Sequence, residues 1–117
     1  MVRRLIQVSI AAMLKTWAGA LAAPILWFMQ QQAAFWPLPD PCRSLGWTTL
    51  GVSLVCVALV VAATILSART LRMTRPGPRH EAGHLLTFGL AVVMPLIFLV
   101  PMAWQGIAGL FYSGCEQ

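Results

Sequence analysis

Three long stretches of this sequence carry no charged side chain, and they constrain the fold more than any other feature. They cover residues 16–39, 44–68 and 82–115. Each stretch is long enough for one helix that crosses the hydrocarbon core of a bilayer, and none is long enough for two helices and a turn. The pattern therefore predicts three membrane-spanning helices.

The composition argues against an ordinary soluble domain. Hydrophobic residues make up 59% of the chain and charged residues only 9%, whereas soluble domains carry roughly 25% charged residues. The net charge of +5 lies in basic clusters beside the apolar stretches rather than in a patch within soluble structure. Such clusters usually determine membrane topology, so we expect no nucleic-acid partner.

We therefore expect a single all-α membrane domain over residues 1–117, with an outer loop at 37–44 and a basic inner loop at 69–80. The expected helices cover about residues 14–36, 45–68 and 81–112. Residues 5–14 either extend the first helix or lie in the membrane interface.

Prolines divide and bend these helices. Three prolines within residues 37–41 stop the first helix. Pro24 lies in the middle of that helix and predicts a kink there, and Pro95 and Pro101 predict bends in the third helix.

The basic residues predict how the chain is oriented. Seven of them fall on one side of the predicted membrane: Arg3, Arg4, Lys15, Arg69, Arg72, Arg75 and Arg79. Only Arg43 falls on the other side. The positive-inside rule then places the N-terminus in the cytoplasm and the C-terminus outside, in a multi-pass protein of the bacterial inner membrane.

A cleaved signal peptide is the alternative interpretation of the N-terminal residues. The basic pair at residues 3–4, an apolar stretch and Ala20-Leu21-Ala22 imitate one. Lys15 interrupts the apolar stretch, and apolar sequence continues beyond the alanines. We therefore expect the first span to be retained.

Two cysteines are predicted on the outer side, which is the oxidising periplasm in a bacterial cytoplasmic membrane. A disulfide between Cys42 and Cys115 would tie the first loop to the C-terminus. The alternative is two free or metal-binding thiols. Cys56 lies mid-span, where a small packing residue is expected.

Residues 80–84 match the H-E-x-x-H pattern, in which His80 and His84 lie one helical turn apart. Membrane-embedded site-2-type metalloproteases, which this motif resembles, need a third ligand, and the Glu acts as general base. The only other carboxylates, Asp40 and Glu116, are expected on the far side, roughly 30 Å away.

We therefore expect residues 80–84 to be a structural interface turn and the chain not to be an enzyme. There Glu81 would lie near the positive end of the helix dipole. Binding of a metal by His80 and His84, or contact with a cofactor of a partner subunit, is the alternative.

Polar and basic residues near the ends of the spans predict contacts. Gln30, Gln31 and Gln32 are expected to hydrogen-bond between helices, and the alternative is a site for a quinone or a partner helix. Lys15 is expected to extend its ammonium group to the inner interface. The arginines of the second loop are expected to fix topology and contact anionic lipid: Arg69, Arg72, Arg75 and Arg79.

One part of the sequence resembles a known group of proteins. Residues 17–27 read Trp-Ala-Gly-Ala-Leu-Ala-Ala-Pro-Ile-Leu-Trp and are followed by Gln31, Phe35 and Cys42. This resembles small three-helix proteins encoded beside haem-copper cytochrome c oxidases in proteobacteria. Those proteins show a Gly, Pro-x-x-Trp, then His or Gln, an aromatic residue and an outer Cys. The match covers about a quarter of the chain.

The resemblance implies association with a respiratory oxidase, as an accessory subunit or assembly factor, and supplies no catalytic residues. We expect lateral docking onto a larger membrane complex and no cofactor of its own, with haem or quinone contact only through that partner. The alternative is a small homo-oligomeric transporter or channel. Its polar stripe would have to come from residues 30–32 with Thr48, Thr49 and Ser53. An H-E-x-x-H metalloprotease is the remaining alternative.

Overall fold

The computed structural model describes residues 1–33, 41–73 and 81–111, with side chains in the second range from residue 46 onward. These residues form three helices, α1 (Val2–Ala33), α2 (Pro41–Met73) and α3 (Glu81–Phe111). Each helix contains a segment that is long and apolar enough to cross a membrane. The expected all-α architecture with three candidate spans is therefore confirmed.

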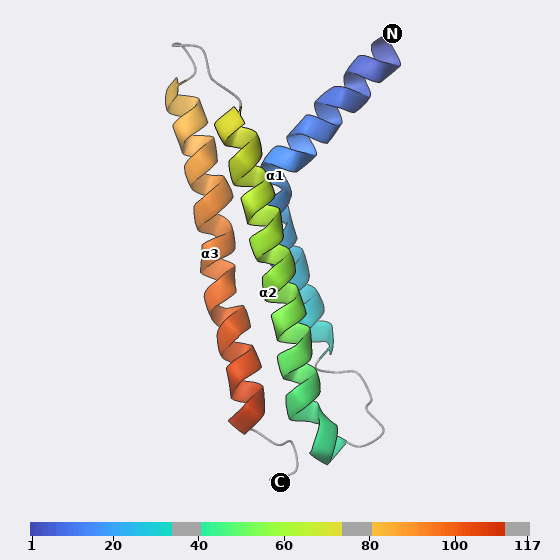
Figure 1. Ribbon diagram of the computed structural model, residues 1–117, viewed down its shortest axis with the longest axis vertical. Helices are drawn as coiled ribbons and strands as arrows, with labels where there is room; N and C mark the ends of the chain where they lie inside the picture. The colour runs from blue at the N-terminus through green and yellow to red at the C-terminus, as the bar shows by residue number, and fades with distance from the viewer. Residues whose placement is uncertain (34–40, 74–80, 112–117) are drawn as a thin grey trace.

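The helices form an elongated bundle in which each packs against the other two. Figure 1 shows α2 and α3 side by side and antiparallel, with most of α1 behind α2. The N-terminal part of α1 points away from the other two helices, and the molecule measures 60 × 31 × 16 Å. Three helices of alternating direction place the start of α1, the end of α2 and the start of α3 toward one end.

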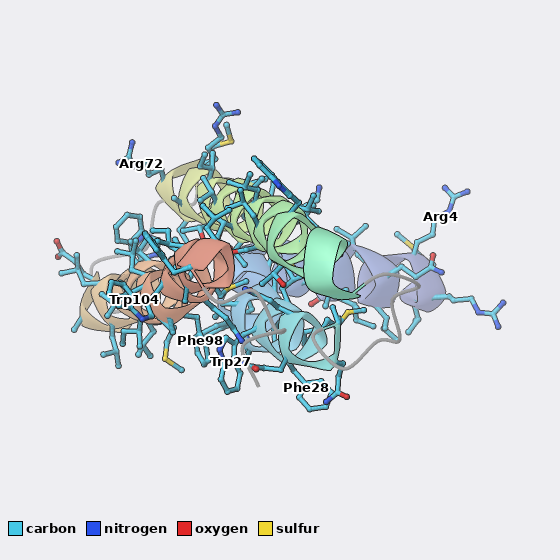
Figure 2. The ribbon with its side chains drawn as sticks, turned by 90° about the horizontal axis from the view of Figure 1, so that it is seen from below. Arg4, Trp27, Phe28, Arg72, Phe98 and Trp104 are labelled. Atoms are coloured by element: carbon cyan, nitrogen blue, oxygen red, sulfur yellow. The ribbon has the colours of Figure 1, made fainter. Side chains whose placement is uncertain are left out.

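The centre of the bundle is narrow and is built from small and medium side chains. Ala23, Cys56, Val60 and Met102 are buried together. The rings of Trp27 on α1 and Phe98 on α3 pack beside them, tilted, with centroids 6.0 Å apart (Figure 2). Most large apolar side chains of the three helices instead face outward. That distribution suits helices surrounded by lipid, where apolar surface has no reason to be buried.

α1 and α2 are longer than expected from the sequence, whereas α3 matches the expected range to within one residue. α1 begins at Val2 rather than near residue 14, and α2 continues to Met73 through two arginines that were expected in the inner loop. Arg, Leu and Met are all good helix formers, so residues 69–73 can continue α2 despite their charges. α2 also begins at Pro41, because proline is well tolerated in the first turn of a helix.

A bend in α1 separates its N-terminal part from the bundle (Figure 1). Every residue from 1 to 15 is exposed, and partial burial begins at Thr16. At this point the Ser67 hydroxyl of α2 accepts a hydrogen bond from Gly19 N–H (2.9 Å) and donates one to the Lys15 carbonyl (3.3 Å). In a regular helix these two backbone groups bond to each other, and a side chain inserted between them is a known cause of bending.

Pro24 lies one turn beyond this insertion, inside the part of α1 that packs in the bundle. Its ring removes the N–H that would bond to the Ala20 carbonyl. Because the exposed part of α1 ends at Lys15, the inserted Ser67 hydroxyl lies nearer to the bend than Pro24 does. Ser67 is therefore the first residue to test as the cause of the bend.

Candidate functional site

Polar side chains from all three helices make hydrogen bonds near one another. They belong to Gln30 and Gln31 of α1, Ser53 of α2 and Gln105 of α3. We call Gln30, Gln31, Ser53 and Gln105 the polar cluster. Two of its members donate to the same backbone carbonyl, that of Met102, over 2.7 Å from Ser53 Oγ and 3.3 Å from Gln30 Nε2. One carbonyl of α3 is thus hydrogen-bonded to both other helices.

Ser53 reaches this carbonyl because the next turn of α3 has no side chain in the way. A Cβ atom at Gly106 would lie 2.7 Å from Ser53 Cβ and closer still to Ser53 Oγ. Two further close approaches follow along the same interface: a Cβ at Gly46 would lie 2.7 Å from the Gly109 carbonyl oxygen, and a Cβ at Gly109 would lie 2.9 Å from Thr49 Cγ2. Small residues at such positions let helix backbones approach closely in lipid.

The other two members of the polar cluster pair with each other. Gln31 Nε2 donates to Gln105 Oε1 (3.2 Å), and Gln105 Nε2 donates to Gln31 Oε1 (3.0 Å). Gln30 Oε1 is buried and has no hydrogen-bond partner within the described part of the chain. Gln32 is exposed and takes no part in the cluster. Of the three adjacent glutamines, two therefore link helices and one faces outward.

An apolar groove of about 630 Å³ lies on the outside of the bundle, between α1 and α2. Its wall consists of aliphatic, aromatic and sulfur-containing side chains, together with Gln32: Leu26, Phe28, Met29, Gln32, Ala33, Val52, Val55, Cys56 and Leu59. Several of these side chains are more than half exposed, among them Phe28, Met29 and Val55. The groove can hold an apolar chain or helix side chains but offers almost no hydrogen-bonding groups.

Two of the H-E-x-x-H residues, Glu81 and His84, lie at the start of α3. Glu81 is exposed in the first turn and His84 is half-buried, while His80 lies outside the described residues. Within the described ranges, no group of three or more His, Cys, Asp or Glu side chains comes together. Asp40 and Glu116 also lie outside those ranges, so their distance from the motif stays a prediction.

The predicted disulfide also falls outside what is described. The side chain of Cys42 and all of Cys115 belong to that part, so their pairing stays a prediction. Cys56 is a free thiol buried in the core, as expected of a packing residue.

The basic residues whose side chains the structure describes are exposed: Arg3, Arg4, Lys15, Arg69 and Arg72. Arg69 and Arg72 lie on the last turns of α2, and Lys15 lies at the bend of α1. Figure 2 shows Arg4 and Arg72 extending away from the bundle. Arg75 and Arg79 lie outside the described residues.

Sequence reasoning did not identify Gln105 or Ser67 as contact residues, and it did not predict the hydrogen bond of Ser53. Each is a polar side chain within an apolar span, and this was the available signal. Only the positions of the neighbouring helices show that two of them bond to backbone groups of another helix.

The arrangement thus uses most of its buried polar groups to join helices. Ser53 and Ser67 bind backbone groups of neighbouring helices, and Gln31 binds Gln105. No comparison connects these residues to a known protein: neither the protein-family models nor the curated proteins nor the solved structures gave a match to this chain.

Proposed function

We propose that this protein spans the bacterial inner membrane three times and docks laterally onto a larger membrane complex, a respiratory terminal oxidase. Its N-terminus would be cytoplasmic and its C-terminus periplasmic. It acts as an accessory subunit or assembly factor and is not itself an enzyme. The observation that carries this proposal is the division between an inward polar cluster and an outward apolar surface with a groove.

The polar cluster supports an interaction protein over a channel. A homo-oligomeric channel needs polar side chains on the face that one copy turns toward the next. Gln30 and Ser53 were candidates for that stripe, but each is only 3% exposed and bonds within its own bundle. Gln31 is held by Gln105. Of the residues named for the stripe, only Gln32 and Thr48 are exposed, so an oligomer of this bundle would line its centre mainly with apolar side chains.

The α1/α2 groove is the surface on which we expect the partner's transmembrane helix. In lipid, association between helices depends on close packing, because lipid tails are as apolar as the side chains. A hollow lined by Phe28, Met29 and Val55 lets side chains of an incoming helix interlock with this one. A smooth apolar face would offer less contact.

A substitution that fills the groove tests the proposal against a matched one outside it. Val55 in the groove and Ile97 on α3 are both 60% exposed. Val55→Trp should reduce recovery of the oxidase with the tagged chain in mild detergent, measured from the haem spectrum of the eluate. Ile97→Trp should leave that recovery near the wild-type level.

Two results would contradict the proposal. One is recovery of the wild-type chain as a homo-oligomer without any haem protein. The other is saturable solute flux through liposomes that contain only this chain, which would favour the transporter. Equal losses of oxidase recovery in Val55→Trp and Ile97→Trp would show that the groove is not the docking surface. Recovery with the wild-type chain would still measure whether the two proteins associate.

A further inference from the structure

The N-terminal part of α1, residues 2–15, is helical but lies outside the bundle. We call it the arm. Every residue in it is exposed, including Leu5, Ile6, Ile10 and Met13. Figure 1 shows it pointing away from α2 and α3 beyond the bend at Ser67. The bundle therefore leaves a helix of four turns with nothing packed on it.

The length of α1 shows that the arm exceeds what a span requires. α1 has 32 residues, or about 48 Å at about 1.5 Å per residue. The hydrocarbon core is roughly 30 Å thick. Residues 16–33 alone would supply about 27 Å at about 1.5 Å per residue, which is most of one crossing. An unbent α1 would carry the apolar side chains of the arm well beyond the core and into water.

The arm has a charged side and an apolar side. At 3.6 residues per turn, Arg3, Arg4, Gln7 and Lys15 fall within about 120° of one another. Leu5, Ile6 and Met13 fall on the opposite side, where Ser9 is the only polar residue, and Ile10 lies at the boundary beside Arg3. Two large apolar residues depart from the pattern: Leu14 falls on the charged side next to the bend, and Val8 falls at the edge of that side.

The positive charge of the arm favours a negatively charged partner. All its charged side chains are basic, and the first acidic residue of the chain is Asp40. A cationic amphipathic helix binds in the plane of a membrane that contains anionic lipid, with its apolar side among the acyl chains. The bend at Ser67 turns the arm out of the bundle axis, which such a position requires.

We infer that the arm lies in the surface of the membrane and binds anionic phospholipid headgroups through Arg3, Arg4 and Lys15. Its apolar side enters the headgroup–acyl boundary, while the rest of α1 crosses the bilayer. This inference does not depend on the docking partner proposed above, because lipid alone is the ligand.

Hydrogen–deuterium exchange on the wild-type chain tests the inference without any substitution. The chain is compared in nanodiscs of phosphatidylcholine alone and of phosphatidylcholine with phosphatidylglycerol. Amides of residues 2–15 should exchange more slowly with the anionic lipid, and those of α3 should not change. The pair Arg3→Gln and Arg4→Gln should reduce the added protection roughly tenfold, since each basic side chain at an anionic surface contributes severalfold. The pair Arg69→Gln and Arg72→Gln is the charge-matched control and should leave the arm unchanged.

Spin labels on the two sides of the arm give a second measurement. In a chain without other cysteines, labels at Ile6 and Met13 should be accessible to oxygen dissolved in lipid. Labels at Gln7 and Ala11 should be accessible to a water-soluble nickel complex. Four labels equally accessible to nickel would mean that the arm stands in water, and four equally accessible to oxygen would mean that it continues the span.

Either spin-label result would overturn the inference. So would amide exchange in the arm that is equally slow with and without phosphatidylglycerol. Protection that rises with the number of chains per nanodisc would instead assign the arm to a second copy of the chain. That outcome would also overturn lipid as its partner. None of these results bears on recovery of a haem protein, so failure here is distinct from failure of the proposed docking.

Discussion

Two serines of α2 each lie close to a glycine of another helix, and the two contacts differ in what they do. Ser53 lies against Gly106 of α3 and donates to the Met102 carbonyl. Ser67 lies against α1 and bonds to both the Gly19 N–H and the Lys15 carbonyl. The first hydroxyl adds a hydrogen bond between two helices. The second stands between two backbone groups that could have bonded to each other.

The Ser53 contact concerns how helices pack, whereas the Ser67 contact lies where a helix bends. At Ser53 the hydroxyl belongs to the polar cluster, so its hydrogen bond helps to hold three helices at fixed distances. At Ser67 the same chemical group lies between two backbone groups of α1, at the bend where the exposed arm ends. The two contacts should therefore respond differently to removal of either the glycine or the hydroxyl.

The largest effect is expected from Gly106→Ala. The new Cβ would lie 2.7 Å from Ser53 Cβ, which is attached directly to the backbone and cannot rotate away. α2 and α3 would have to separate, and overpacking of this kind costs about 1–3 kcal/mol. Unfolding by a denaturing detergent, followed by circular dichroism, measures the loss.

Gly51→Ala is the matched control for this change, because a Cβ at Gly51 meets nothing within 4 Å. It should leave the unfolding midpoint unchanged or raise it, since alanine favours helix over glycine. A Gly106→Ala variant as stable as Gly51→Ala would show that the close contact with Ser53 does not exist.

A smaller loss is expected from Ser53→Ala. The hydroxyl leaves, but the Met102 carbonyl keeps the bond from Gln30 Nε2 and is not left without a partner. Hydrogen bonds between helices in membranes contribute about 0.6 kcal/mol on average. The same unfolding assay should detect a loss of about this size.

Thr87→Ala is the control for Ser53→Ala, because the Thr87 hydroxyl bonds to the Gly83 carbonyl of its own helix. It should change the midpoint less than Ser53→Ala does. Equal losses would mean that the bond between α2 and α3 adds nothing beyond what a hydroxyl bonded within its own helix provides.

The sequence predicted the number of helices better than their contacts. Absence of charge over residues 16–39, 44–68 and 82–115 was sufficient to predict three helices that are long and apolar enough to cross a membrane, because lipid imposes that requirement on each helix separately. Helix ends were less predictable, since residues 69–73 carry charges and still extend α2. Prolines indicated where a helix could bend, but the exposed part of α1 ends beside Ser67.

For the polar cluster, the sequence predicted the glutamines that make contacts but not the groups that they bind. Three adjacent glutamines in an apolar span indicated contacts, and Gln30 and Gln31 make them. Their partners, the Met102 carbonyl and Gln105, lie more than 70 residues further along the chain, as the separations of 72 and 74 show. No local pattern specifies such pairs, because they depend on how the helices are rotated against each other.

The smallest effect on stability, and the clearest effect on shape, is expected from Ser67→Ala. Without the hydroxyl, Gly19 N–H and the Lys15 carbonyl can bond to each other as in a regular helix, so little hydrogen bonding is lost. The unfolding midpoint should therefore fall less than for Ser53→Ala, while α1 straightens and the arm moves toward the end of α2. The distance between spin labels at Gln7 and Met73 measures this movement and should shorten.

Pro24→Ala provides the comparison for Ser67→Ala, because it restores a backbone N–H one turn beyond the insertion without touching Ser67. If the inserted hydroxyl causes the bend, the label distance should change more in Ser67→Ala than in Pro24→Ala. The reverse order would assign the bend to the proline and reduce Ser67 to a contact like that of Ser53. Both serines would then only form hydrogen bonds between helices, at different positions along α2.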